Sequence, residues 1–296
     1  MSLEIKCCKE KFNPIIKIVK HLKHKLGFAK NNPNYFYPDG LVIFTGRQGS
    51  GKTLSAVNYV YNLLNEYPQA KLVTNIQLKD YPIVTFKDYI KNNKEQYLKL
   101  KETLGDKTDQ TFYNLYLKNN KVFEFKNDED FKRYDNGKQG VIFLVDEIQL
   151  YLNSLQSKNI NLDTINQISQ QRKQRKHVIA TSQVFGRMAK PLREQFSEVV
   201  LCENILGFIQ KNQYIDRTSI KEGDNTGLNL QGQVKGKYYF IHDPEYYSRY
   251  DTYYVIDKNK FVSGEDQLDI YNNQENYILE QKGDPKNERR KSKWNN

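Results

Sequence analysis

The stretch of sequence that decides the fold is GRQGSGKT, at residues 46–53. It satisfies the pattern G-x-x-x-x-G-K-[ST], and the apolar run LVIFT at residues 41–45 comes directly before it. A helical pattern follows, in which four apolar residues share one face: Leu54, Val57, Tyr61 and Leu64. A strand, this loop and a helix in that order indicate a phosphate-binding loop.

The residue types in this loop suit the phosphate chain of a nucleotide. Glycines let backbone N–H groups close around phosphate oxygens, and the N-terminus of the following helix adds a partial positive charge. Lys52 is expected to reach the β- and γ-phosphates, and the Thr53 hydroxyl is expected to bind Mg²⁺. The sequence therefore predicts ATP and Mg²⁺ as ligands. The expected nucleotide-binding residues are Gly46, Gln48, Gly49, Ser50, Gly51, Lys52 and Thr53.

A second motif ends the apolar run VIFLV at residues 141–145, where Asp146 and Glu147 follow. An acidic residue at the carboxyl end of a buried strand lies near the phosphate-binding loop, so we expect Asp146 to be a Mg²⁺ ligand. Glu147 is then the candidate catalytic base for an attacking water. Many strands end in acidic turns, but the combination with the loop favours a catalytic pair. Because the sequence has no guanine-reading Asn-Lys-x-Asp motif, hydrolysis of ATP is predicted rather than a GTP switch.

Strand-like apolar runs alternate with helical patterns, which predicts an α/β fold with a mostly parallel sheet flanked by helices. The expected strands are Leu41–Thr45, Lys71–Ile76, Val141–Asp146, His177–Ser182 and Glu198–Glu203. A polar insertion at about residues 87–137 separates the second and third strands, and exposure to solvent is the simplest explanation of its charge. After residue 203 the chain becomes rich in tyrosine, and the runs KYYFIHD and YDTYYVID are expected to form a small C-terminal β addition.

Four regions are expected along the chain: a basic N-terminal helical arm at 1–38, the core at 39–210, the Tyr-rich β extension at 211–280 and a disordered basic tail at 281–296. In the arm, the residues after Pro14 predict a helix that Gly27 ends. Its apolar stripe could lie on an anionic membrane or grip DNA, but docking on its own domain or on a neighbouring subunit is the simpler interpretation. The stripe consists of Ile15, Ile18, Val19, Leu22 and Leu26.

The net charge favours a polyanionic partner. The chain of 296 residues has 46 Lys and Arg against 35 Asp and Glu, a net charge of +11, which is typical of proteins that bind nucleic acid or acidic membranes. An AT-rich coding sequence also enriches lysine, so that explanation stays open. The 3 cysteines form no CxxC pair, which indicates a reducing compartment without a disulfide framework. With no signal peptide or apolar membrane span visible, we expect the cytoplasm, with at most peripheral membrane contact.

The run HVIATSQ, residues 177–183, ends in a glutamine beside several arginines. In a sheet that places this strand between the loop-bearing strand and the Asp-Glu strand, Gln183 faces the γ-phosphate and senses or orients the water. An ordinary polar strand end is the alternative. An arginine that reaches a neighbouring subunit's nucleotide completes the site in many ring ATPases, although DNA contact or plain surface charge explains these arginines equally well. The candidates are Arg172, Arg175, Arg187 and Arg193.

Several stretches in this order resemble the zonular-occludens-toxin-like P-loop ATPases of phages, within the FtsK/HerA superfamily of DNA-translocating motors. They are GRQGSGKTLSAVNYVY, VTNIQL, FLVDEIQLYLNS, QQRKQRKHVIATSQVFGRMAKPLREQ and YSRYDTYYVID, and they span roughly residues 40–257. The resemblance implies an additional-strand, RecA-like core in which the strand ending at Ser182 separates the two nucleotide-binding strands. It also implies oligomeric rings. It assigns nucleotide binding to Lys52 and Thr53, Mg²⁺ to Asp146, the base to Glu147 and the sensor to Gln183.

Filamentous-phage members of that group usually continue into a membrane span and an exported portion, and neither is visible here. We therefore expect a motor that docks on a portal, a capsid or a DNA complex. The predicted function is a Mg²⁺-dependent ATPase that acts as a homo-oligomeric ring and moves or packages DNA, which it holds non-specifically through phosphates. One alternative is an ATP-binding assembly or scaffolding factor of phage morphogenesis that switches on nucleotide without moving DNA. A small-molecule kinase is another, but no lid or acceptor site is apparent.

Overall fold

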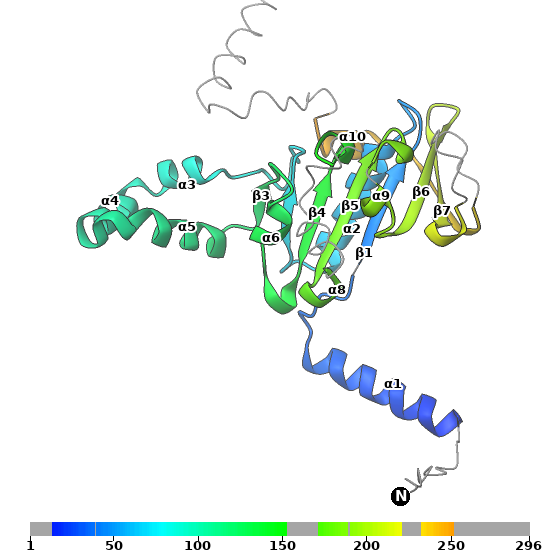
Figure 1. Cartoon of the computed structure of the whole chain (residues 1–296), viewed down its shortest axis with the longest axis horizontal. Helices are drawn as coiled ribbons and strands as arrows, with labels where there is room; N and C mark the ends of the chain where they lie inside the picture. Colours follow the sequence, from blue (N-terminus) through cyan, green and yellow to red (C-terminus); the bar gives the residue numbers. More distant parts are fainter. Residues whose placement is uncertain (1–13, 39, 153–170, 189, 221–231, 252–296) are drawn as a thin grey trace, which may run out of the picture. The chain divides into compact units, whose positions relative to one another are not determined.

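The computed structural model describes residues 14–38, 40–152, 171–188, 190–220 and 232–251. Within these ranges one mostly parallel sheet carries helices on its faces (Figure 1). The expected basic tail and most of the expected strand YDTYYVID lie outside the described residues.

In the described part of the chain the sheet has eight strands in the order β3-β2-β4-β5-β1-β6-β7-β8. The strands are β1 (Gly40–Thr45), β2 (Lys71–Thr74), β3 (Val122–Glu124), β4 (Val141–Val145), β5 (Lys176–Ser182), β6 (Phe196–Ile205), β7 (Ile209–Asp216) and β8 (Val234–Ile241). All neighbours from β3 to β6 are parallel, and the pairs β6–β7 and β7–β8 are antiparallel. The predicted α/β class is confirmed, and the C-terminal strands β7 and β8 extend the main sheet.

Strand β5 is the additional strand that separates β1 from β4. Its Ala180 lies opposite Ile43 of β1 and Val145 of β4, so the three strands end at the same edge. Parallel strands present their carboxyl ends together, and an open α/β sheet binds ligands at that edge. The register therefore brings together the loop after Thr45 and the acidic pair after Val145.

Strand β1 shows how the sheet is buried on both faces. Val42 and Phe44 pack with α2 in one hydrophobic cluster, and Ile43 packs into a second cluster on the other face. Strands covered on both sides need continuous apolar runs, which explains why LVIFT and VIFLV lack alternation. The four apolar residues predicted for one face of the following helix, Leu54, Val57, Tyr61 and Leu64, are all buried.

The α-helices are α1 (Pro14–Asn31), α2 (Lys52–Glu66), α3 (Phe86–Asn92), α4 (Lys94–Leu104), α5 (Thr108–Asn119), α6 (Asp130–Arg133), α8 (Gln171–Gln174), α9 (Lys190–Arg193) and α10 (Pro244–Ser248). Short 3₁₀ helices are η1 (Gly105–Lys107), η2 (Gly137–Gln139), η3 (Ile148–Leu150), η5 (Phe185–Arg187) and η6 (Arg217–Ser219).

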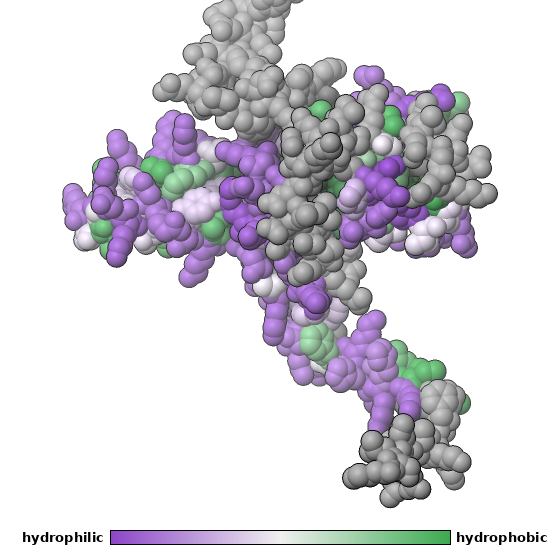
Figure 2. Space-filling model, in the orientation of Figure 1, coloured by the Kyte–Doolittle hydropathy of each residue, from purple (hydrophilic) through white to green (hydrophobic). Residues whose placement is uncertain are grey.

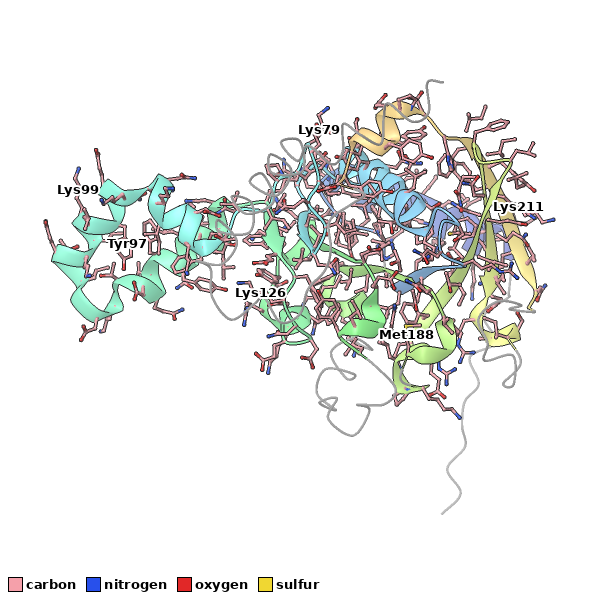
Figure 3. All side chains as sticks on the ribbon, turned by 90° about the horizontal axis from the view of Figure 1, so that it is seen from above. Lys79, Tyr97, Lys99, Lys126, Met188 and Lys211 are labelled. Carbon is pink, nitrogen blue, oxygen red and sulfur yellow. The ribbon has the colours of Figure 1, made fainter. Side chains whose placement is uncertain are left out.

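The insertion between β2 and β4 is more structured than its charge predicts. Helices α3 and α5 bury Tyr89, Phe112 and Tyr116 in an aromatic cluster, and β3 joins the sheet beside β2. Helix α4 has no buried residue. Figure 3 shows the Tyr97 side chain of α4 between the helices and the Lys99 side chain pointing away from them. The expectation of a solvated surface thus holds for α4, whereas α3 and α5 enclose an apolar interior.

Helix α1 continues through Gly27 to Asn31, so the predicted end at Gly27 is wrong. The helix ends where Asn32 donates from its side-chain amide to the Phe28 carbonyl, at 3.0 Å, and where Pro33 follows. Its apolar stripe is exposed, from 45% at Val19 to 71% at Ile15, and Figure 2 shows hydrophobic side chains, in green, on this helix. Among the described helices, none combines the length and apolar character that a membrane span requires.

Candidate nucleotide site

The loop between β1 and α2 has a backbone shape that requires glycine. Gly51 has a φ of 78°, and a Cβ atom there would collide with the side chain of Gln210. A Cβ atom on Gly46 would lie 2.6 Å from the Cys202 carbonyl oxygen. Residues with a side chain are therefore excluded at both positions, and the loop packs closely against β6 and β7.

Two polar side chains, Lys52 and Ser50, line the start of α2. Lys52 is buried, and its Nζ donates to the Arg47 carbonyl at 3.1 Å, across the loop. The Ser50 hydroxyl is buried and has no hydrogen-bond partner among the described residues. Because the first N–H groups of a helix also lack partners within the helix, this loop offers several unpaired donors to an anion.

Asp146 is the centre of a hydrogen-bond network. Its Oδ1 accepts from the Thr53 hydroxyl at 3.0 Å and from the Thr181 hydroxyl at 2.5 Å. Its backbone is held by the Asn75 side chain, which accepts from the Asp146 N–H at 2.8 Å and donates to the Asp146 carbonyl at 2.9 Å. The carboxylate is thus fixed beside Thr53, in the first turn of α2, near the loop as expected.

Glu147 has a left-handed backbone, with a φ of 50°, which is uncommon for a residue with a side chain. Its N–H donates to the Thr181 hydroxyl at 2.9 Å. Its carboxylate accepts from the Gln183 amide at 3.2 Å and from the Gln149 amide on its other oxygen. The predicted base and the predicted sensor are therefore in direct contact at the end of β4 and β5.

The oxygen donors of Asp146 and Thr53 fit Mg²⁺. Burial raises the pKa of the Asp146 carboxyl, and the negative charge of Glu147 adds to the increase. Hydrogen bonds from Thr181 and Thr53 oppose it, as does the positive charge of Lys52. A buried carboxylate beside a hydroxyl oxygen supplies the hard oxygen ligands that Mg²⁺ prefers, and a cation there would stabilise the ionised form.

A polar network that begins at buried Gln210, behind the loop, was not predicted from the sequence. Gln210 of β7 is fully buried, and its Nε2 donates to the Ser50 carbonyl at 2.9 Å and to Asn212 Oδ1 at 3.0 Å. Its Oε1 is therefore the acceptor for His242 Nε2, at 3.0 Å, and the Tyr247 hydroxyl pairs with His242 Nδ1 at 2.6 Å. The network connects the phosphate-binding loop to residues that follow β8.

The four candidate arginines occupy different places. Arg175 precedes β5, at the amino end of the strands, and its guanidinium lies over the Tyr35 ring at 4.2 Å. Arg193 ends α9, and its carbonyl accepts from Arg217 Nε at 3.0 Å. Arg172 belongs to α8 and Arg187 to η5, and the structure describes the backbone but not the side chain of either residue.

The family model that matches the sequence is that of the zonular occludens toxin (Zot), over residues 40–238. None of the curated proteins that were compared matches the sequence.

Three solved structures are similar in fold at low sequence identity. The N-terminal domain of the zonular occludens toxin from Neisseria meningitidis is 16% identical, covers 72% of this chain and 98% of its own, and gives a TM-score of 0.42. The DNA-packaging ATPase B204 from Sulfolobus turreted icosahedral virus is 15% identical, covers 70% and 98%, and gives 0.42. The ATPase domain of G40P is 16% identical, covers 81% and 98%, and gives 0.39.

Proposed function

We propose that this chain, which belongs to the zonular occludens toxin family, is a Mg²⁺-dependent ATPase that moves or packages DNA as a homo-oligomeric ring. The observation that carries the proposal is the contact of Asp146 with both Thr53 and Thr181 at the carboxyl edge of the sheet. Three segments far apart in the sequence meet there, and each brings a group that nucleotide hydrolysis needs. A structural turn alone does not require this convergence.

The loop at residues 46–53 would hold the phosphates of ATP. Its backbone N–H groups and the Ser50 hydroxyl donate to phosphate oxygens, and Lys52 leaves the Arg47 carbonyl to pair with the β- and γ-phosphates. Thr53 and Asp146 would hold Mg²⁺, which when bound neutralises phosphate charge and orients the γ-phosphate for attack.

Glu147 would act as the base for hydrolysis. The oxygen of a water attacks the γ-phosphorus in line with the leaving group, and Glu147 takes a proton from that water. The bond from the γ-phosphorus to the bridging oxygen breaks, and ADP leaves with the electron pair. Gln183 holds one carboxylate oxygen of Glu147, so it positions the base. Lys52 and an arginine from a neighbouring subunit would stabilise the developing charge, with Arg172, Arg175, Arg187 and Arg193 as candidates.

Contact with DNA is expected through its phosphates. The net charge of +11 supplies a non-specific attraction that weakens as salt rises. The family resemblance implies the same partner, and a ring would surround or flank the duplex. A portal or capsid protein is the expected docking partner of such a motor.

The chemistry is tested by replacing the base while its shape is kept. Glu147→Gln should retain ATP binding but lower kcat by about 10²- to 10⁴-fold, since the proton acceptor is lost. Lys52→Ala should abolish binding and turnover. Glu203→Gln makes the same change at an exposed position on β6 and should hydrolyse ATP at the wild-type rate. Full hydrolysis by Glu147→Gln would contradict the assigned role.

The exposed apolar stripe of α1 favours a second candidate function, an assembly factor that binds a capsid or portal protein and switches on ATP. Tight ATP binding without turnover, with or without DNA, would support this candidate. In that case Ile18→Asp and Leu22→Asp should abolish partner binding while ATP affinity stays constant.

A further inference from the structure

A cleft of about 620 Å³ opens at the amino ends of β4 and β5, the edge opposite the nucleotide site. Its lining includes Tyr35, Lys132 and Lys138 from segments before β4, and Lys173 and Arg175 from the segment before β5. Figure 1 shows α8, which carries Lys173, at the start of the β5 arrow. We call this site the basic cleft, and its volume is in the range of ligand sites in proteins.

The charges of the basic cleft converge from separate segments. Lys132 lies on α6, Lys138 on η2 and Lys173 on α8, and all three side chains are exposed. Asp135 also lines the cleft, and its Oδ1 accepts from the Gly137 N–H at 3.1 Å. Five basic side chains and this one carboxylate line the cleft, so the lining carries a net positive charge that favours an anionic ligand. This arrangement differs from the lysines of α4, which follow one solvated helix.

Arg175 is held in an unusual conformation at the base of the basic cleft. Its φ is 54°, a left-handed backbone that costs free energy in a residue with a side chain. Its carbonyl accepts from the Val141 N–H at 2.9 Å, and its guanidinium stacks over Tyr35. A guanidinium held over an aromatic ring can still donate its edge N–H groups to a phosphate.

The wall that carries Tyr35 is firmly anchored. The neighbouring Phe36 is fully buried, and its N–H donates to the Lys138 carbonyl at 2.9 Å. A Cβ atom on Gly140, whose φ is 77°, would collide with the Phe36 ring. On the other side, the Lys176 Nζ donates to the Phe131 carbonyl at 2.7 Å, which holds the start of β5 against α6. The cleft is therefore formed before any ligand arrives.

We propose that the basic cleft binds the sugar-phosphate backbone of DNA. Phosphate oxygens pair with Lys132, Lys138 and Arg175, and a deoxyribose packs beside the Tyr35 ring. The inference rests on the proposed function for the presence of DNA and adds the surface that holds it. DNA and ATP then sit at opposite ends of β4 and β5. If Arg175 binds DNA in this way, Arg172, Arg187 and Arg193 remain as candidates for the arginine that acts in trans.

The test compares two charge-reversed variants of the full chain. Lys132→Glu/Lys138→Glu changes the basic cleft, and Lys99→Glu/Lys101→Glu makes the same change in net charge on exposed α4. Binding of a short labelled DNA duplex is measured without ATP between about 50 and 200 mM salt. A plot of log affinity against log salt has a negative slope, and the cleft variant should make that slope shallower by about two units. It should also weaken DNA binding at least tenfold at low salt. The α4 variant should bind within about twofold of wild type.

A second variant keeps the proposal testable where the double variant does not fold. Arg175→Asn preserves the left-handed backbone, which asparagine tolerates, and should lower the salt slope by about one unit. Thermal unfolding verifies that each variant is folded. Vesicles of phosphatidylserine and free inorganic phosphate serve as competing probes.

Each outcome decides the question. If the cleft and α4 variants lose equal DNA affinity, or the cleft variants lose none, the assignment of DNA binding to the basic cleft is wrong, while the proposed function stands. A wild-type chain that binds no DNA would overturn the proposed function itself. Binding to the vesicles but not to DNA would assign the basic cleft to a lipid surface, and displacement of DNA by an equal concentration of phosphate would assign it to a small anion.

Discussion

A single hydroxyl connects the two acidic residues of the nucleotide site. Thr181 Oγ1 donates to the Asp146 carboxylate and accepts from the Glu147 N–H, so it fixes the proposed metal ligand and the proposed base relative to each other. A side chain that makes both bonds positions the reacting groups without touching the substrate. Its loss should affect turnover more than ATP binding.

Thr181→Val tests this, because valine keeps the shape and removes the hydroxyl. Losing a hydrogen bond to a charged group costs about 2 kcal/mol, so kcat should fall about 30-fold while KM changes less than threefold. Thr181→Ser restores the hydroxyl and should recover most of the activity. Steady-state kinetics would contradict the role by showing equal effects of valine and serine.

The positions of residues in local motifs were predictable from the sequence, whereas the long-range contacts that hold these residues were not. Lys52, Thr53 and Asp146 stand in recognisable patterns, and the structure places Thr53 and Asp146 in contact. Asn75 and Thr181 reach Asp146 from the ends of β2 and β5. The sequence does show a polar residue directly after an apolar strand, as at Asn75 after β2. Which residue it contacts depends on the order of the strands in the sheet, and the sequence does not give that order directly.

At the scale of elements, β7 supports the phosphate-binding loop from behind. Gln210 closes over Gly51 and donates to the Ser50 carbonyl, while Asn212 on the same face accepts from the Ser55 hydroxyl at 3.1 Å. The loop is therefore shaped both by its glycines and by an antiparallel strand that enters the sheet late in the chain.

Gln210→Leu should weaken this support. It leaves the buried Ser50 carbonyl without a partner, which costs about 1–3 kcal/mol, so the melting temperature should fall and the Kd for ATP should rise about tenfold. Gln213→Leu makes the same change on the opposite face of β7 and should stay within about 0.5 kcal/mol of wild type. Equal behaviour of the two variants in ATP titrations would disprove the supporting role.

His242 gives this element a pH dependence. Burial lowers the pKa of His242, so the folded state favours the neutral ring that pairs with Gln210 and Tyr247. A lowered folded pKa means that the stabilisation is complete above the unfolded pKa of about 6.5 and is lost as pH falls through the folded pKa. When the pH is lowered from about 7.5 to 5.5, the melting temperature of the wild type should therefore fall more than that of His242→Gln. A constant difference would show that His242 does not titrate in this range.

The elements were predicted best where apolar runs are long. Strands β1, β4, β5 and β6 stand close to their expected positions, because buried parallel strands consist almost entirely of apolar residues. Strand β7 was not expected, since IQKNQYID buries amides that pair with one another. Strand β3 spans only Val122–Glu124 and follows a helical hairpin, so its short pattern gave no signal. Both strands gain their stability from neighbours in the sheet.

At the scale of the whole molecule, the proposed ring requires that one subunit complete the site of the next. A Lys52→Ala subunit lacks ATP binding but keeps every arginine, whereas an Arg187→Ala or Arg193→Ala subunit keeps an intact loop. Each variant alone should be nearly inactive when the arginine acts in trans. Mixing the two should restore part of the activity, because some interfaces combine an intact loop with an intact arginine. Failure to complement in either mixture would exclude that arginine as the trans residue.

The central claim, that hydrolysis at the Asp146 site is coupled to DNA, is tested most directly by steady-state ATP hydrolysis with Mg²⁺, with and without DNA, at low and moderate salt. Lys52→Ala provides the blank. The proposed motor should hydrolyse ATP faster with DNA, the stimulation should fall as salt rises, and the variant should show neither. Turnover that is indifferent to DNA, or absent despite tight ATP binding, would contradict the account.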